Sequence, residues 1–349
     1  MEQYVGLDVS QQTTHLCVID NNGKTVWRGQ CASTPEAIAK AIETKAPKVV
    51  RVGLESGPLS TWHWHALKAM GLPIVCLDAR HAQTALSLQV NKTDKNDAEG
   101  LAQIVRMGWY REVGVKSLAS HTARAMLGVR AQLVGMRTNV MNQIRGTLKT
   151  FGIVLGKGKG SGRAFEQQVQ QIAQRGGLLG DTLQALLAVR RSLGEQLLIL
   201  DRRVSTFTKD NTACRHLMTA PGIGVLTAIA VVTAVDDPAK FKHSRSVGAY
   251  FGLTPKRYQS GEKDVTGHIS RCGDPLVPSY LYEAANVVLA RTGKGSALKV
   301  WGLRLARRAG MKKAKVAVAR KLAVILHRMW TTGEAFRWSN PEPAVAAAT

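Results

Sequence analysis

The 349 residues suffice for two or three domains. The chain has 48 Lys and Arg against 24 Asp and Glu, a net charge of +24. This excess predicts nucleic acid as the first candidate for the partner and an anionic membrane surface as the second. The chain shows no signal-peptide pattern, no apolar stretch long enough to cross a bilayer, and no zinc-type spacing among its five cysteines. We therefore expect a cytoplasmic protein with reduced thiols and exclude a secreted or membrane-spanning one.

The first 110 residues alternate between strand and helix patterns. Strands are expected at "YVGLDVS", "THLCVID" and "TVWRGQCAS", the last two forming a hairpin across the "NNG" turn. Next come a helix capped by Thr34 with Pro35 at its first position, the strand "KVVRVGLES", the helix "STWHWHALKAMG", the strand "PIVCLDA" and a helix containing Asp94. This order is typical of an α/β ribonuclease H-like domain, which we place at residues 1–112.

Four acidic residues stand out in this part of the chain. Strand alternation places Asp8 on the same face as Gly6, and Glu55 ends the fourth strand. Asp94 and Asp97 share one helix face, where two like charges cost a few tenths of a kcal/mol. In a ribonuclease H-like sheet the first and fourth strands are neighbours and the last helix crosses nearby, so the four acids would converge. Such a cluster is unfavourable without cations, and two Mg²⁺ ions roughly 4 Å apart would suit phosphoryl transfer.

Each acid also has an ordinary structural interpretation. Asp8 could pair with a buried Lys or Arg, and Glu55 could be a loop acid. Thr93 or Asp94 could cap the helix, with Asp97 completing a capping box.

Residues 113–211 carry two long amphipathic helical patterns with a coiled-coil-like seam. A flexible basic linker, "GKGKGSGR" at 156–163, separates them. The pattern fits either a helical hairpin packed on itself or a dimerising arm. The apolar residues at the 3–4 spacing are Met126, Val129, Leu133, Met136 and Val140 in the first helix, and Leu183, Leu186, Leu193, Leu197, Leu200, Val204 and Phe207 in the second.

From residue 212 to 333 the chain is mostly helical, and 334–349 reads as a disordered tail. "APGIGVLTAIAVV" resembles a helix-hairpin-helix, whose exposed backbone N–H groups hold phosphate, although any helix–helix turn could use these glycines. Residues 291–328 contain twelve Lys or Arg and no acid, so we expect them to contact phosphates rather than form only a solvated face. The cations we select from this segment are Arg307, Arg308, Lys312 and Lys313.

The stretch "AYFGLTPKRYQSGEKDVTGHISRCGD" at 249–274 contains Ser260 in a glycine-rich basic loop. A polar turn is the simple interpretation, because Ser-Gly is a common turn dipeptide. As a nucleophile Ser260 would need a base or a metal for activation, and His268 is the nearest histidine along the chain. The flanking cations that could neutralise a phosphate are Lys256, Arg257, Lys263 and Arg271.

These motifs occur as an ordered set: "GLDVS", "LESGP" and "KTDKNDAEGLA", then "APGIGVLTA" and "YFGLTPKRYQSGEKDVTGHISRCGD". Together they resemble the DEDD transposases of insertion sequence family 110, which are akin to the Piv-type DNA invertases. The resemblance covers nearly the whole chain, to about residue 330.

The resemblance implies a Holliday-junction-resolvase-like N-terminal domain whose metal site is Asp8, Glu55, Asp94 and Asp97, holding two Mg²⁺ ions. It implies that the serine of the G-L-T-P-x-x-x-x-S-G motif, Ser260, is catalytic and exchanges DNA strands through a covalent phosphoserine link. Relatives are guided by a structured bridge RNA that pairs with donor and target DNA, and they act as dimers that assemble into tetramers. A bacterial, nucleoid-associated location follows.

Two other functions remain open beside a recombinase. A junction-resolving nuclease would hydrolyse DNA with the acids alone, leaving Ser260 structural. A non-catalytic nucleic-acid-binding protein would use its acids only as helix caps. A sugar-kinase-like fold opens with a similar strand, but the paired acids and the charge of +24 argue against a small-molecule substrate.

Overall fold

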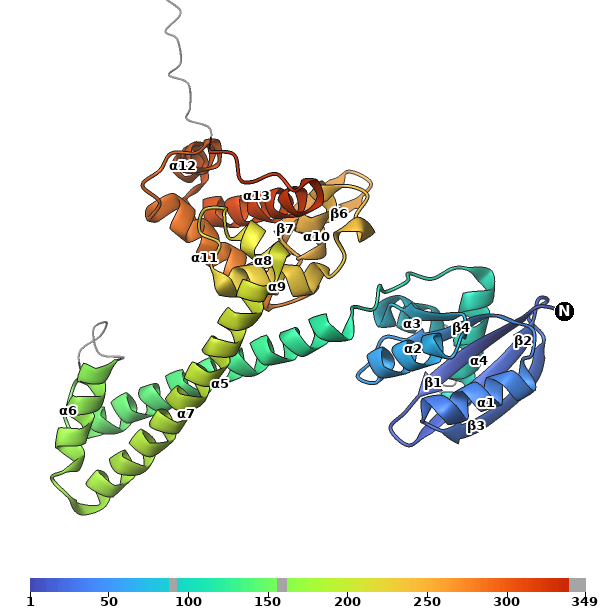
Figure 1. Ribbon diagram of the computed structural model, residues 1–349, viewed down its shortest axis with the longest axis horizontal. Helices are drawn as coiled ribbons and strands as arrows, with labels where there is room; N and C mark the ends of the chain where they lie inside the picture. The colour runs from blue at the N-terminus through green and yellow to red at the C-terminus, as the bar shows by residue number, and fades with distance from the viewer. Residues whose placement is uncertain (88–92, 156–161, 339–349) are drawn as a thin grey trace, which may run out of the picture. The chain divides into compact units, whose positions relative to one another are not determined.

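The computed structural model describes residues 1–87, 93–155 and 162–338 (Figure 1). They form two compact units, Met1–Lys116 and Ser117–Thr349. Most of the linker expected at 156–163, and the segment 339–349 of the expected tail, lie outside the described residues. Among the described helices, none is both long enough and apolar enough to cross a membrane.

The first unit is a five-stranded mixed sheet with helices on both faces, as expected of an α/β domain. The strand order is β3-β2-β1-β4-β5, with β1 antiparallel to β2 and parallel to β4. The helices α1 and α2 pack on one face, whereas α4 covers the other. The elements are β1 (Gln3–Val9), β2 (Thr13–Asp20), β3 (Thr25–Ala32), α1 (Pro35–Lys45), β4 (Val49–Glu55), α2 (Ser60–Ala69), β5 (Ile74–Leu77), α3 (Ala79–Leu86) and α4 (Asp94–Met107).

Local sequence rules explain most of these elements. Strand alternation in β1 buries Val5 and Leu7 against α1 and α2, as the pattern predicts. The Thr34 side chain accepts a hydrogen bond from the backbone N–H of Ala37 and caps α1, with Pro35 at its start. The short helix α3 was not expected, and it begins where the Asp78 carboxylate caps two backbone N–H groups.

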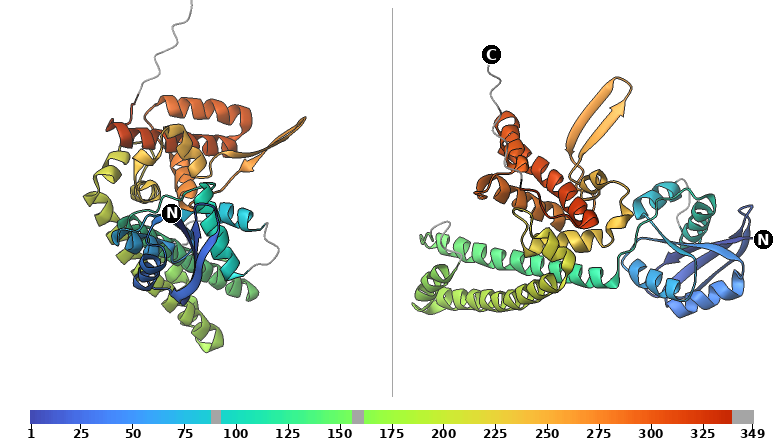
Figure 2. Two further views of the ribbon diagram at one scale, coloured as in Figure 1. Left: turned by 90° about the vertical axis from the view of Figure 1, so that its right-hand side faces the viewer. Right: turned by 45° about the horizontal axis from the view of Figure 1, so that its top comes forward.

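The second unit is mainly helical and contains one two-stranded sheet. Its core is built around α9, which is almost wholly buried and packs against α5, α7, α8 and α11. Figure 2 shows the β6–β7 hairpin standing away from the neighbouring helices. The elements are α5 (Leu118–Thr150), α6 (Arg163–Ala173), α7 (Gly177–Asp210), α8 (Thr212–Leu217), α9 (Val225–Val235), the short 3₁₀ segments Pro238–Lys240 and Ser244–Ser246, α10 (Val247–Tyr250), β6 (Pro255–Ser260), β7 (Lys263–Ile269), α11 (Leu276–Ala290), α12 (Ala297–Ala309) and α13 (Met311–Thr332).

The two long helices expected in the middle of the chain are α5 and α7, which lie side by side (Figures 1 and 2). An ion pair of 2.5 Å joins Arg130 to Asp201 across them. Two residues of the seam predicted for α5, Val129 and Met136, are 52% and 42% exposed, so they do not pack within this pair of helices. The residues that α5 buries are instead Ser120, Ala123, Leu127, Met141, Ile144 and Leu148.

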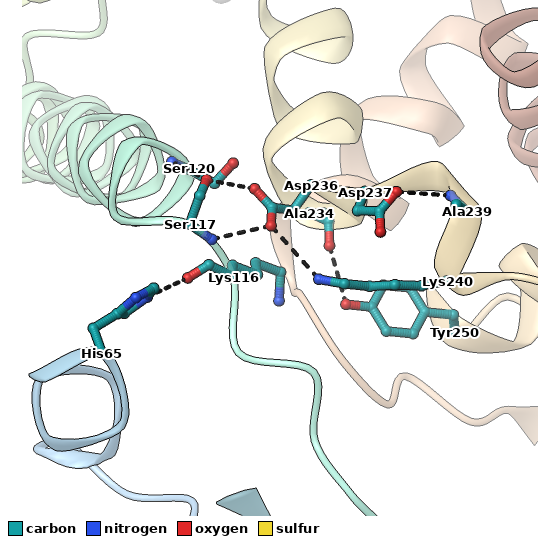
Figure 3. A network of polar contacts seen from close by, with 10 residues as sticks. All are labelled: His65, Lys116, Ser117, Ser120, Ala234, Asp236, Asp237, Ala239, Lys240 and Tyr250. Atoms are coloured by element: carbon teal, nitrogen blue, oxygen red, sulfur yellow. Dashed lines mark hydrogen bonds and ion pairs between the residues drawn. The ribbon is translucent and has the colours of Figure 1, made fainter. Parts of the chain in front are cut away.

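Asp236 fastens the start of α5 to the end of α9 within the second unit (Figure 3). Its carboxylate accepts bonds of 2.6 Å from the Ser117 hydroxyl and 3.0 Å from the Ser117 backbone N–H. Burial raises the pKa of Asp236, but hydrogen bonds from Ser117 and Ser120 and the charge of Lys240 outweigh it, so the pKa is lowered to about 2. Asp236 also has a φ of 66°, so this connection holds a strained backbone.

The turn expected to resemble a helix-hairpin-helix joins α8 to α9. Gly222 in this turn has a φ of 77°, and a Cβ there would lie 2.5 Å from the Ala284 carbonyl oxygen of α11. A close helix–helix approach therefore explains this glycine without a phosphate.

Candidate active site

Two of the four acids lie on adjacent parallel strands at the same edge of the sheet. Leu7 of β1 is opposite Leu54 of β4, and the next residue in each strand is an acid, Asp8 and Glu55. Each of these two side chains is half-buried and has a polar contact. The carboxyl ends of neighbouring parallel strands meet at one edge, so the structure brings these two acids together.

The helix α4 reaches this edge because two glycines let it approach the sheet closely. A Cβ added to Gly6 would lie 2.1 Å from the Ala98 carbonyl oxygen, and one added to Gly53 would lie 2.4 Å from Val105 Cγ1. Gly6 shares its sheet face with Asp8, two residues further along β1. The room beside Asp8 is therefore filled by the backbone of α4.

The direction of α4 places its N-terminus toward Asp8. Near its other end, Gln103 and Arg106 donate hydrogen bonds to the carbonyls of Gly23 and Asn21, in the turn between β2 and β3. That turn lies at the opposite edge of the sheet from Asp8, because β2 is antiparallel to β1. The first turn of α4 therefore extends toward the edge that carries Asp8.

Neither of the paired aspartates is the N-cap of α4. Thr93 is the N-cap of α4, and its hydroxyl accepts a hydrogen bond from the backbone N–H of Asn96. Asn96 occupies the third helical position, which in a capping box carries the reciprocal side chain, so Asp97 does not complete one. Within the described residues, the side chains of Asp94 and Asp97 have no hydrogen bond or ion pair.

We name the four acids that the sequence predicts to converge, Asp8, Glu55, Asp94 and Asp97, the acid cluster. Carboxylate oxygens are the donors that Mg²⁺ prefers, so the chemistry of this donor set fits that ion. In the part of the chain that the structure describes, no three His, Cys, Asp or Glu side chains lie close enough together to hold a metal. Mg²⁺ is commonly held by one or two carboxylates, with waters and substrate phosphates completing its shell, so the donor set remains suitable.

The sequence interpretation missed His15, which is directly opposite Asp8 in the register of β1 and β2. Directly opposite residues point to the same face of a sheet, so His15 shares the α4 side with Asp8. Lys95 of α4 and Gln30 of β3 line a pocket of about 430 Å³ with His15. No sequence motif links His15 to Asp8, because a turn separates them. Only the pairing of β1 with β2 shows that the two residues are neighbours.

Ser260 lies at the end of a strand rather than in a loop. It is the last residue of β6 and pairs with Lys263 of β7 across the two-residue turn Gly261-Glu262, in which Gly261 has a φ of 54°. Tyr258, two residues before Ser260 and on the same face of the hairpin, pairs with Val265. The described residues of the hairpin are almost all exposed, so the Ser260 hydroxyl faces solvent.

The cations around Ser260 have different surroundings. Arg257 forms a bidentate pair with Asp264, at 2.8 and 2.6 Å, and its guanidinium lowers the pKa of Asp264. Lys263 lies beside Ser260, whereas Arg271 follows β7 at the other end of the hairpin. His268 is near Ser260 along the chain but not in space. Its neighbour Ile269 pairs with Pro255 at the end of the hairpin far from the turn, so His268 lies at that end and Ser260 at the other.

The four cations selected from the acid-free segment are all exposed. Arg307 and Arg308 are in the last turn of α12, and Lys312 and Lys313 are in the first turn of α13. Gly310, with a φ of 84°, joins the two helices. We name this group the basic turn, and no ion pair within the described residues neutralises it.

Comparisons with known proteins match both halves of the chain. A family model for DEDD transposases of IS110, described as transposase, matches residues 5–153, and one described as transposase of the IS116/IS110/IS902 family matches residues 214–299. The transposase for insertion sequence element IS1111A of Coxiella burnetii is 29% identical over 95% of this chain and 91% of its own length. A probable family 20 transposase of Pseudomonas aeruginosa is 25% identical, and the transposase for IS1328 of Yersinia enterocolitica is 24% identical; each alignment covers 95% of this chain and 98% of the relative.

Proposed function

The chain belongs to the IS116/IS110/IS902 family of insertion-sequence transposases, and from this premise we propose that it cuts and exchanges DNA strands with the acid cluster and Ser260. The observation that carries the proposal is the placement of Asp8 and Glu55 at one sheet edge toward which α4 presents Asp94 and Asp97. The strand order and the connections of the sheet support a ribonuclease H-like assignment for the first unit.

The acids and Ser260 have separate roles in the proposed reaction. The acid cluster would hold Mg²⁺, which when bound supplies charge stabilisation at a phosphoryl oxygen. Ser260 Oγ attacks the phosphorus of a DNA phosphodiester and loses its proton. One bond from phosphorus to a deoxyribose oxygen breaks, that oxygen takes a proton, and the phosphorus stays joined to Ser260. Attack by a deoxyribose hydroxyl of another strand reverses these changes and completes the exchange.

The exposed hairpin supports this role for Ser260. A nucleophile that becomes joined to a DNA strand must reach a bulky, charged polymer, and the end of an exposed hairpin permits that approach. Lys263 opposite Ser260 places a positive charge beside the phosphate under attack. The carboxylate of Asp264 is already paired with Arg257, which limits its repulsion of DNA.

The partners in this proposal are donor and target DNA, with a guide RNA that pairs with both. The net charge of +24 and the exposed basic turn support a polyanionic partner. We further propose that α5 and α7 serve as a coiled-coil arm through which protomers form dimers and then tetramers. The exposure of Val129 and Met136 supports an apolar surface available to a second chain.

Incubation with labelled donor DNA, followed by denaturing SDS gel electrophoresis, tests the proposal. We expect a Mg²⁺-dependent protein–DNA band that EDTA removes and that Ser260→Ala eliminates. Cut DNA without a covalent band would instead favour a nuclease that uses the acids alone. Binding with neither cleavage nor a covalent band would favour a non-catalytic nucleic-acid-binding protein. Gln259→Ala, which changes the residue beside Ser260 in the same exposed strand, is the matched control and should retain the band.

A further inference from the structure

A groove of about 1250 Å³ runs between the β6–β7 hairpin and the helix α13. One wall comes from the end of the hairpin far from Ser260, where Pro255 and residues 266–269 lie. The other wall is one face of α13, because its lining residues recur at intervals of three and four. We name this feature the basic groove. The cations that line it are Arg271, Lys312, Lys313, Arg320 and Lys321.

The charge of the groove is one-sided. None of the described residues that line it is acidic, and none of its five cations has an ion pair within the described part of the chain. The Lys321 ammonium lies 3.8 Å from the centre of the Trp301 ring, so the indole fixes one of these charges at the wall. An anionic occupant is therefore the one that complements the groove.

Apolar side chains lie between these cations. Val316, Val324 and Ile325 of α13 are half-buried and line the groove together with Ile269 of the hairpin. A DNA duplex presents phosphates on its outside and keeps the faces of its bases stacked inside. An unpaired strand exposes both its phosphates and its base faces, so it matches cations beside apolar surface better than a duplex does.

We propose that the basic groove binds an unpaired DNA strand, with phosphates on the cations and bases against the apolar residues. The choice of DNA rests on the proposed function, because Ser260 lies at the other end of the same hairpin. The five-residue step along β6 from Pro255 to Ser260 corresponds to about 17 Å. A strand joined to Ser260 can therefore continue along the hairpin into the groove, which keeps the cut end from diffusing away.

Equilibrium binding in a Ser260→Ala background tests the groove without requiring cleavage. Fluorescence anisotropy would compare a 20-nucleotide DNA strand with its duplex and with an RNA strand of the same sequence. The groove variant is Arg271→Gln/Arg320→Gln/Lys321→Gln, which leaves the basic turn intact. Its control, Arg202→Gln/Arg203→Gln/Lys209→Gln on α7, removes the same charge from exposed residues that do not line the groove.

We expect the groove variant to bind the single strand about tenfold more weakly, with a log–log salt slope flattened by about two units. Its affinity for duplex should change no more than that of the control. Val324→Thr, which keeps the shape of the side chain and replaces a methyl group with a hydroxyl, should weaken single-strand binding without changing the salt slope. Equal single-strand affinities for the groove variant and the control would overturn the proposal. So would groove-dependent binding that favours RNA or duplex over single-stranded DNA. Because the protein lacks Ser260, these results do not depend on the proposed cleavage chemistry.

Discussion

Gly6→Ala tests whether the close approach of α4 to the sheet positions the acid cluster. The added Cβ would lie 2.1 Å from the Ala98 carbonyl oxygen and 2.4 Å from the Ala102 backbone nitrogen, both backbone atoms that cannot turn aside. The helix must withdraw by roughly 1 Å, and such overpacking costs about 1–3 kcal/mol of unfolding free energy. The same shift moves Asp94 and Asp97 away from Asp8, and a displacement of this size can cost about 10²-fold in rate.

The matched control is Gly57→Ala, two residues after Glu55. A Cβ at Gly57 meets no described atom within 4 Å, so the change should leave both stability and cleavage close to wild type. Amide hydrogen exchange of α4 measures the local stability, and the rate of DNA cleavage per folded protein measures the effect on the site. Wild-type protection of α4 and wild-type cleavage in Gly6→Ala would refute the reasoning.

Three further predictions concern the metal, the charge and the acid response of the protein. Replacing any one aspartate of the acid cluster with Asn should abolish DNA cleavage, and so should EDTA. Filter binding of DNA should persist, because these acids bind metal rather than DNA. Normal cleavage by all the variants would reject the metal-site assignment. Gln at all four cations of the basic turn should flatten the log–log salt slope of duplex binding by up to about four units, and an unchanged slope would mean that the turn is only solvated. The Asp236 pKa, lowered to about 2 from an ordinary 3.8, contributes about 2 kcal/mol of stability that is present above pH 4 and is lost as the pH falls through 2. Asp236→Asn should remove this part of the pH dependence of urea unfolding between pH 5 and pH 2.5, and identical curves for the two proteins would contradict it.

The sequence was most informative where local and tertiary signals agree. In β1, alternation and the glycine beside Asp8 indicated a strand with room on one face, and α4 fills that room. The neighbouring placement of β1 and β4, inferred from the order of elements, was confirmed. Thr34 and Pro35 marked the start of α1 correctly, because capping depends only on nearby residues.

The sequence was least informative where burial does not follow local pattern. Both strands of the β6–β7 hairpin are exposed on both faces, so no apolar alternation marks them, and the segment was interpreted as a loop. In α5 the apolar residues that define the predicted seam are not the ones buried, since the helix packs on α7 and on α9 with different faces along its length. The position of His15 opposite Asp8 depends on strand register, which spacing along the chain does not encode.

The proposed covalent link between DNA and Ser260 is tested most directly by mass spectrometry of the trapped protein. After reaction with donor DNA and Mg²⁺, nuclease digestion would leave a short nucleotide on the attached residue, and peptide mapping would locate it. We predict a nucleotide phosphate adduct on the peptide that contains Ser260, absent when EDTA is added or when Asp8 is replaced by Asn. DNA that is cut while the Ser260 peptide remains unmodified, or an adduct on a different residue, would contradict the proposed reaction.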